Sequence, residues 1–177
     1  PPIPSNEIKQ YWGDLKIQKL DAGDKSAALQ GATFEVYEAK DPYAATCSAT
    51  MADNATAISV NGATTFTSDA KGSIDIAGLF VSDNQNAPID AIQRCYVIKE
   101  TQAPAGYVTP SGADALNAVA VKTGATSGFD ITVDNSKEVV PGLPLTGSQT
   151  SVIMAVLGIA LIGGAAGLAI RRRSNQR

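Results

Sequence analysis

The sequence predicts an all-β domain, a two-sheet sandwich, followed by one C-terminal transmembrane helix. Three observations support this prediction. Between residues 14 and 137, short runs of alternating apolar and polar residues are separated by Gly, Asp, Asn and Pro, which is typical of all-β folds. The same region has no long amphipathic helical pattern. Nineteen residues without a charge, 152–170, are followed directly by three arginines.

Six strands can be assigned along the chain, at 15–20 (LKIQKL), 32–39 (ATFEVYEA), 73–79 (SIDIAGL), 94–100 (RCYVIKE), 117–122 (NAVAVK) and 129–135 (FDITVDN). Turn-forming residues separate them at 21–24, 69–72, 105–106 and 124–128. Residues 1–13 contain three prolines and are expected to be irregular. Residues 40–66, rich in Ala and Thr, are expected to form an insertion. Six or seven strands in about 125 residues favour a single sandwich.

The charge distribution argues against nucleic-acid binding. All 17 acidic residues lie at or before Glu138, whereas four of the 14 basic residues lie in the last seven positions. The chain before this tail has 17 acids against 10 bases, a net charge of −7, and nucleic acid binds the opposite charge. There is no His and no CxxC pattern, so we expect no metal and no cofactor.

The uncharged segment indicates a membrane anchor. As a helix, residues 152–170 would be about 28 Å long, close to the thickness of a bilayer core. The alternative is a buried core helix, but a soluble helix of this length normally carries a polar stripe, and this segment has none. The arginines at 171–173 are typical of the cytoplasmic side of a membrane, so residues 1–147 are expected outside. Because the chain begins with Pro1 and has no leader, we expect a secretion signal upstream, with or without further domains.

The two cysteines, Cys47 and Cys95, are expected to form a disulfide, since the domain would lie outside the cell. The alternative is two unpaired buried thiols. Cys95 alternates with the predicted inward residues of its strand, so a bridge would attach the 40–66 insertion to the outer face of the sheet.

Three strands end with a polar residue on a face that is otherwise apolar. Residues two apart in a strand share a face. The polar residues are Lys19, Glu100 and Asn135. The apolar residues on their faces are, in the same order, Leu15 and Ile17, Tyr96 and Ile98, and Phe129, Ile131 and Val133. Each polar residue alone would be expected to turn toward solvent at its strand end.

Together, an amine, a carboxyl and a carboxamide have the chemistry of an internal amide bond. Burial favours the neutral form of a lysine, and the neutral amine is a nucleophile. A buried, protonated Glu100 would polarise the carboxamide of Asn135 and transfer the protons. The amine of Lys19 would attack, ammonia would leave, and a Lys19–Asn135 isopeptide bond would join two strands.

The sequence resembles the collagen-adhesin B-type (CnaB-like) domain of Gram-positive surface proteins. The segments that carry the resemblance are 13–39, which includes LQGATFEVYE, 96–108, which includes the E-box-like ETQAPAGY, and the closing strand ITVDNSK. With the C-terminal features, the chain is similar to SpaA-type shaft pilins over about residues 13–173.

This resemblance implies an Ig-like or prealbumin-like form of the two-sheet sandwich, and it implies roles for the same three residues. The bond-forming lysine would be Lys19, in QKLD, with Lys16 as an alternative of outward parity. The E-box carboxyl would be Glu100, the catalytic residue. The acceptor would be Asn135, with the neighbouring Asp134 as the alternative.

The pentapeptide LPLTG resembles the LPxTG sorting signal of sortase, a membrane transpeptidase. It comprises Leu143, Pro144, Leu145, Thr146 and Gly147. The alternative is an ordinary Leu-Pro loop. The resemblance implies cleavage between Thr146 and Gly147 and transfer of Thr146 to a lysine of another subunit or to the cell wall. The position of the signal, after a Pro-Gly spacer and before an uncharged segment, fits this use.

These features predict a secreted structural subunit of a covalently polymerised, peptidoglycan-anchored pilus at the cell surface. The expected partners are sortase, neighbouring pilin subunits, peptidoglycan, the membrane during export and, as a further possibility, a host surface ligand. Because the internal bond forms once per chain, the chain is not expected to be an enzyme. The alternatives are the stalk of a monomeric wall-anchored adhesin and the stalk of a tethered surface enzyme. A donor lysine in a pilin motif would distinguish a pilus subunit from these alternatives, and residues 1–177 contain no such motif.

The predicted division of the chain has five parts: an N-terminal linker at 1–13, the CnaB-like sandwich at 14–138, the spacer and sorting signal at 139–147, the transmembrane helix at 148–170 and the cytoplasmic tail at 171–177.

Overall fold

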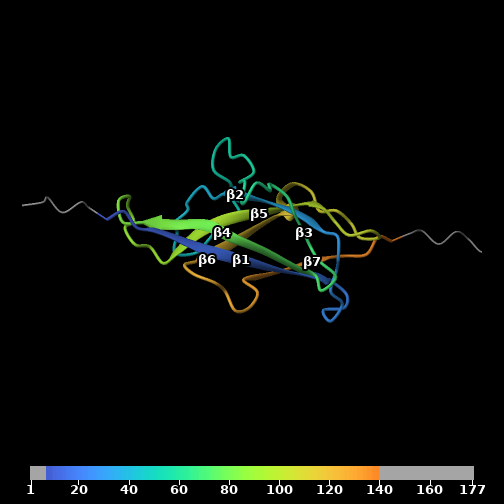
Figure 1. Ribbon diagram of the computed structural model, residues 1–177. Helices are drawn as coiled ribbons and strands as arrows, with labels where there is room; N and C mark the ends of the chain where they lie inside the picture. Colours follow the sequence, from blue (N-terminus) through green and yellow to red (C-terminus); the bar gives the residue numbers. More distant parts are fainter. Residues whose placement is uncertain (1–6, 140–177) are drawn as a thin grey trace, which may run out of the picture. The chain divides into compact units, whose positions relative to one another are not determined.

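Two β-sheets pack face to face in the computed structural model, which describes residues 7–139 (Figure 1). The elements are β1 (Gln10–Asp21), β2 (Thr33–Glu38), β3 (Phe66–Thr67), β4 (Ser73–Asp83), β5 (Gln93–Gln102), the 3₁₀-helix η1 (Gly112–Ala115), β6 (Leu116–Lys122) and β7 (Ile131–Asn135). The predicted all-β two-sheet fold is therefore confirmed. The predicted sorting signal, transmembrane helix and cytoplasmic tail lie outside the described residues.

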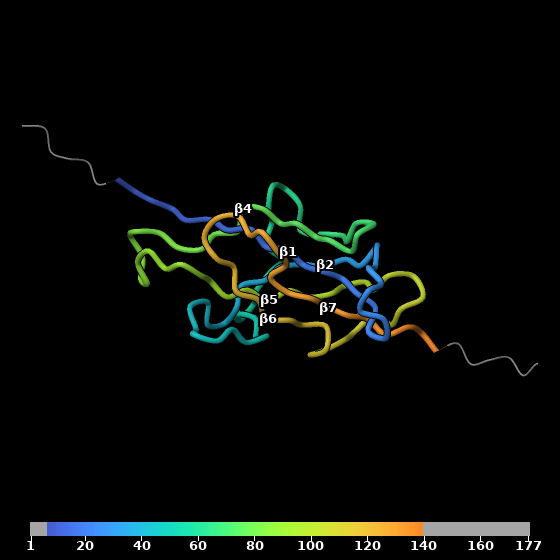
Figure 2. Tube along the Cα trace, turned by 90° about the horizontal axis from the view of Figure 1, so that it is seen from below, coloured from blue at the N-terminus to red at the C-terminus, as the bar shows by residue number. Residues whose placement is uncertain are grey.

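The first strand is the centre of one sheet. That sheet has the order β4-β1-β7, and the other has the order β3-β2-β5-β6. β1 is antiparallel to β4 and parallel to β7, so the first and last strands of the domain are direct neighbours. The start of β1 and the end of β7 lie at opposite ends of the sandwich (Figures 1 and 2).

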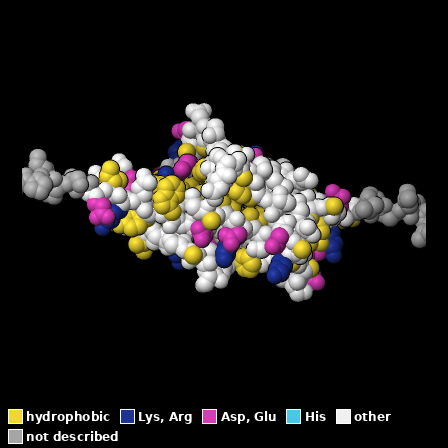
Figure 3. Space-filling model, in the orientation of Figure 1, with side chains coloured by type: hydrophobic (Ala, Val, Ile, Leu, Met, Phe, Trp, Pro, Cys, Tyr) yellow, Lys and Arg dark blue, Asp and Glu magenta, His cyan; other side chains and the backbone are white. Residues whose placement is uncertain are grey.

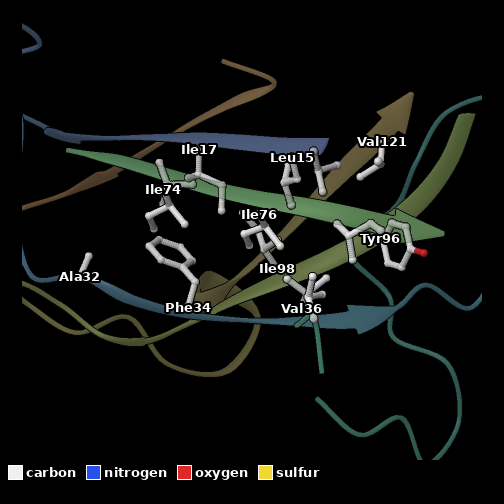
Figure 4. Packing of buried hydrophobic residues seen from close by; sticks show 14 of the residues in the cluster. Leu15, Ile17, Ala32, Phe34, Val36, Ile74, Ile76, Tyr96, Ile98 and Val121 are labelled. Atoms are coloured by element: carbon white, nitrogen blue, oxygen red, sulfur yellow. The ribbon is translucent and has the colours of Figure 1, made fainter. Parts of the chain in front are cut away.

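The core lies between the two sheets and contains the inward residues that strand parity predicts. Leu15, Ile17, Tyr96 and Ile98 are all at most 1% exposed. Figure 4 shows them pointing toward one another across the interior, together with Phe34, Val36, Ile74, Ile76 and Val121. A smaller cluster of Ala39, Cys95 and Val97 is buried on the outer face of the β3-β2-β5-β6 sheet, because the 40–66 insertion covers it.

The first strand begins earlier than the sequence indicates. Residues 10–13, expected to be irregular, are the start of β1 and pair with the end of β4 through two register shifts. Gly13 makes this possible, because a Cβ there would lie 1.9 Å from the main-chain oxygen of Lys122. The alternation of apolar and polar residues is visible in the sequence only from residue 15 onward. The close approach at Gly13 and the two register shifts interrupt it before that point, so the pattern does not reveal residues 10–13 as part of the strand.

The prediction that Phe129 faces inward with Ile131 and Val133 is wrong. Phe129 is 50% exposed and precedes β7, which begins at Ile131. The cause lies at Asp130, whose N–H donates to the Lys16 main-chain oxygen and whose Oδ2 accepts the Lys16 N–H, both at 2.8 Å. A side chain therefore replaces the main-chain partner at this position, and the regular alternation ends there.

On the face shown in Figure 3, acidic and basic side chains lie next to one another rather than in patches of a single sign. This surface lacks the basic stripe that nucleic-acid-binding proteins present.

Candidate isopeptide site

Lys19 lies on the inner face of β1, and none of it is exposed. Its Nζ donates a hydrogen bond to the main-chain oxygen of Val133 on β7, 3.0 Å away, and the two residues are paired in the parallel register. The amine is thus held at the junction of the first and last strands, two residues before Asn135.

A tight turn supports the backbone of Lys19 from the side. The N–H of Lys19 donates to the oxygen of Gly72 at 2.7 Å, and its oxygen accepts from Leu29 at 2.9 Å. Gly72 has φ +68°, and a Cβ at this residue would lie 2.4 Å from the Lys19 oxygen. Only glycine allows the turn to approach this closely in this conformation.

Glu100 faces the same interior from the opposite sheet. It lies on β5 opposite Phe34 of β2 and is 1% exposed. Burial raises the pKa of Glu100 to about 7, although the charge of Lys19 and a hydrogen bond from Asn135 both act to lower it. Its Oε1 has no hydrogen-bond partner among the described residues.

Asn135, the last residue of β7, is 3% exposed. Its Nδ2 donates to Glu100 Oε2 at 3.4 Å and to the main-chain oxygen of Val108 at 3.2 Å. Its main-chain oxygen accepts from the N–H of Ala22 at 2.9 Å. The carboxamide oxygen Oδ1, like Glu100 Oε1, has no partner among the described residues. The structure therefore brings together the three residues that strand parity selects.

The electrostatics bring the proton affinities of the amine and the carboxyl closer together. Desolvation lowers the pKa of Lys19, a shift that the charges of Glu100 and Asp134 oppose and that of Lys25 reinforces. Because burial also raises the pKa of Glu100, the state with a neutral amine and a neutral carboxyl becomes accessible. That state is a nucleophile next to a proton donor.

The two alternative residues face elsewhere. Lys16 is part-exposed and forms an ion pair with Asp75, at 3.6 Å, on the outer side of the sheet. Asp134 forms an ion pair with Lys25. Neither side chain is hydrogen-bonded to Glu100 or Asn135 within residues 7–139.

Sequence reasoning missed a polar cluster beyond the three residues, which consists of Asp21, Tyr107 and Lys137. Asp21 is 3% exposed, and its Oδ2 accepts from Tyr107 Oη at 2.8 Å and from Lys137 Nζ at 3.0 Å. Two features of the sequence pointed to this cluster. Asp21 is two residues after Lys19 and therefore lies on the same face of the strand, and Tyr107 is the last residue of the E-box-like segment ETQAPAGY. These contacts, with the Gly23 N–H, lower the pKa of Asp21 to about 2.

The predicted disulfide is confirmed. Cys47 and Cys95 are bonded, with their Cα atoms 5.4 Å apart. The N–H of Cys95 donates to the oxygen of Pro42 at 2.7 Å, so the insertion is held to β5 by both main-chain and covalent contacts. The bond lies on the outer face, away from Glu100, as parity predicts.

Within residues 7–139, no group of three or more His, Cys, Asp or Glu side chains could hold a metal ion. No helix in the same residues is long and apolar enough to cross a membrane, and the segment predicted to do so falls outside them.

The fold and sequence together define a class: a prealbumin-like two-sheet domain that precedes an LPxTG signal. The chain belongs to the family of SpaA prealbumin-like fold domains, whose profile matches residues 13–137. The profile of the LPXTG cell wall anchor motif matches residues 135–176. The chain is therefore a surface protein anchored to the cell wall.

Fimbrial proteins are among its relatives. The chain is 41% identical over 184 residues to fimbrial subunit type 2 of Actinomyces naeslundii, covering 99% of this chain and 34% of that protein. It resembles the crystal structure of the Actinomyces fimbrial adhesin FimA with a TM-score of 0.63 and 40% identity, covering 78% of this chain and 49% of the other. Domains D2 and D3 of the major pilin SpaD from Corynebacterium diphtheriae give a TM-score of 0.58 at 26% identity, over 75% and 50% of the two chains. The chain spans about a third of the length of the curated relatives it matches.

Proposed function

We propose that this chain belongs to a structural subunit of a covalently polymerised, cell-wall-anchored fimbria. The anchor profile and the fimbrial relatives support this assignment. We further propose that sortase cleaves between Thr146 and Gly147 and joins Thr146 to a lysine of the next subunit or to the cell wall. In this proposal residues 14–138 are the load-bearing domain, residues 139–147 present the signal, and residues 148–177 are a temporary membrane anchor.

The domain is proposed to carry an autocatalytic isopeptide bond between Lys19 and Asn135. The observation that supports it is the burial of an amine, a carboxyl and a carboxamide in one apolar interior, with two of their oxygens unpartnered among the described residues. Buried polar groups without partners cost about 1–3 kcal/mol each. Such a group of residues is hard to explain as a stabilising feature, and a reaction gives it a role.

The proposed reaction balances without a cofactor. Neutral Lys19 Nζ attacks Cγ of Asn135, so that the Nζ–Cγ bond forms and the Cγ–Nδ2 bond breaks. Glu100, whose Oε2 is 3.4 Å from Nδ2, gives its proton to the leaving nitrogen and takes one from Nζ. Ammonia leaves and Glu100 ends in its initial state, so the chemistry occurs once per chain and the subunit is structural rather than an enzyme.

Intact mass spectrometry tests the internal bond. The purified chain should be lighter than its disulfide-bonded sequence by one ammonia, and Glu100→Ala and Asn135→Ala should keep the full mass. Lys122→Met, which changes a lysine on β6, is the matched control and should still lose ammonia. An unmodified chain with the full mass would overturn the proposed bond.

Surface extracts test polymerisation. The wild-type cell should give a ladder of bands resistant to SDS, and deletion of residues 143–147 should abolish it. The second candidate function, the stalk of a monomeric adhesin, is favoured by the description of one similar protein as a fimbrial adhesin. A single band from the wild-type cell would support that candidate and exclude the polymer.

A further inference from the structure

The polar cluster of Asp21, Tyr107 and Lys137 lies next to the proposed bond, and the proposed reaction takes no atom or proton from it. Asp21 is paired with Asn135 in the register of β1 and β7. Tyr107 lies in the loop that follows β5, and Lys137 follows β7. The cluster thus joins the three chain segments that surround Asn135.

The loop after β5 is held against the end of the domain by several contacts. Tyr107 and Lys137 form an antiparallel bridge. The N–H of Val108 donates to Ser136 O, and the N–H of Glu138 donates to Gly106 O, both at 2.9 Å. The Tyr107 hydroxyl adds a side-chain contact to Asp21 at 2.8 Å, which ties this loop to β1 as well.

The same loop holds the reacting amide. Its Val108 oxygen accepts from Asn135 Nδ2 at 3.2 Å, which leaves the second N–H of that nitrogen to donate to Glu100 Oε2 at 3.4 Å. The orientation of the carboxamide therefore depends on where the loop lies. Val108 itself is 50% exposed, whereas Asn135 is 3% exposed, so the loop is the thin cover between the leaving nitrogen and solvent.

Resting on the proposed isopeptide bond, we propose that Asp21, Tyr107 and Lys137 are positioning residues for its formation: they fix the loop at 103–109 so that the Val108 carbonyl orients Asn135 for attack by Lys19. None of the three touches the reacting atoms. Their effect is on geometry, and small displacements of a reacting group slow a reaction strongly. The carboxylate of Asp21 suits this role because it accepts from the main chain of Gly23 as well as from both partners.

The test follows refolding and reaction separately in the whole chain. Unreacted chain, recovered from inclusion bodies in denaturant, is diluted to refold, quenched at intervals and weighed by mass spectrometry. Trp12 is the single tryptophan and packs edge-on against Phe80, so its fluorescence reports folding.

We expect Tyr107→Phe to refold at the wild-type rate but to lose ammonia about tenfold more slowly, with the pH dependence of the rate unchanged in shape. The pH dependence should keep its shape because Glu100 and Lys19, the groups that titrate in the reaction, are unchanged. Tyr37→Phe, which removes a hydroxyl bound to Glu35, is the matched control and should react at the wild-type rate.

The outcomes separate this inference from the proposed bond. If the refolded wild type loses no ammonia, the proposed bond is wrong. If the wild type reacts and refolded Tyr107→Phe reacts equally fast, the positioning role is wrong while the bond stands. Should Tyr107→Phe not refold, Lys137→Met decides: slowed ammonia loss after normal folding supports the role, and a wild-type rate overturns it.

Discussion

The disulfide and the proposed isopeptide site of this domain differ in what surrounds them. The disulfide between Cys47 and Cys95 lies in an apolar cluster on the outer face of one sheet. Lys19, Glu100 and Asn135 lie between the sheets, where an amine and a carboxyl are desolvated and two oxygens have no partner among the described residues. The first region stabilises the fold as it stands. The second buries polar groups at a cost that the proposed bond would offset, so in this proposal local stability and chemical reactivity are separated on the two faces of β5.

Blocking the proposed bond should give the largest effect. The bond would close a loop nearly as long as the domain, for which the chain-entropy account gives about 5 kcal/mol. Lys19→Met, which keeps an unbranched side chain that is one atom shorter but removes the amine, should lower the free energy of unfolding by about that amount. Urea denaturation checks it. Lys16→Met, which loses only an ion pair with Asp75 that is part-exposed, should cost less than about 1 kcal/mol. Equal stability of Lys19→Met and the wild type would show that the proposed bond does not stabilise the domain.

Removing the disulfide should cost slightly less. The two cysteines are 48 residues apart, and the same account gives about 4 kcal/mol for a loop of this size. We expect the double change of Cys47→Ala and Cys95→Ala to lower the urea midpoint accordingly, while the loss of ammonia stays complete. If the double variant kept the full mass, the two regions would be coupled rather than independent. Reduction of the wild type with dithiothreitol gives a control without any substitution.

The pH dependence of an unreacted variant should expose the cost of the buried carboxyl. Burial raises the pKa of Glu100 from 4.5 to about 7, so the folded state holds its proton more tightly than the unfolded state. Lys19→Met also removes the charge that lowers this pKa, so the pKa of Glu100 in the folded variant should not fall below that value. Stability should therefore be highest below pH 4.5 and lower by about 3 kcal/mol at pH 7.

Adding Glu100→Gln to Lys19→Met provides the control for that pH profile. The amide does not titrate, so the fall between pH 4.5 and 7 should disappear in urea denaturation series. A fall of the same size in the double variant would assign the pH dependence to another group.

The sequence predicts faces better than it predicts contacts. Alternation placed Lys19 and Glu100 inward and Cys95 outward, because each lies within a long regular strand where residues two apart must share a face. The same argument failed for Phe129, since the strand had not yet begun there. Parity needs a regular main chain, and Asp130 ends that regularity with its side chain.

Contacts between loops were not predictable in this way. The hydrogen bonds of Asp21 with Tyr107 and Lys137 depend on how two loops close over the end of the sandwich. Parity places Asp21 on the inner face of β1 with Lys19, but no common period relates residues 107 and 137 to it, so the contacts among the three could not be derived. The candidate site was therefore predictable in its three core residues and not in the cluster that covers it.

The smallest effect should come from this cluster and would show whether charge, rather than burial of neutral groups, stabilises the end of the domain. The hydroxyl of Tyr107 and the ammonium of Lys137 are the main causes that lower the pKa of Asp21 from 3.8 to about 2. A lowered carboxyl pKa means that its stabilisation is present above pH 3.8 and is lost as the pH falls through 2. Urea denaturation between pH 4 and 2 should show this loss in the wild type and not in Asp21→Asn. Tyr107→Phe removes the hydrogen bond that lowers the pKa of Asp21 most. In this variant the pH at which half of the stabilisation is lost should therefore move up toward 3.8. Parallel pH profiles for all three proteins would mean that the cluster acts through packing alone.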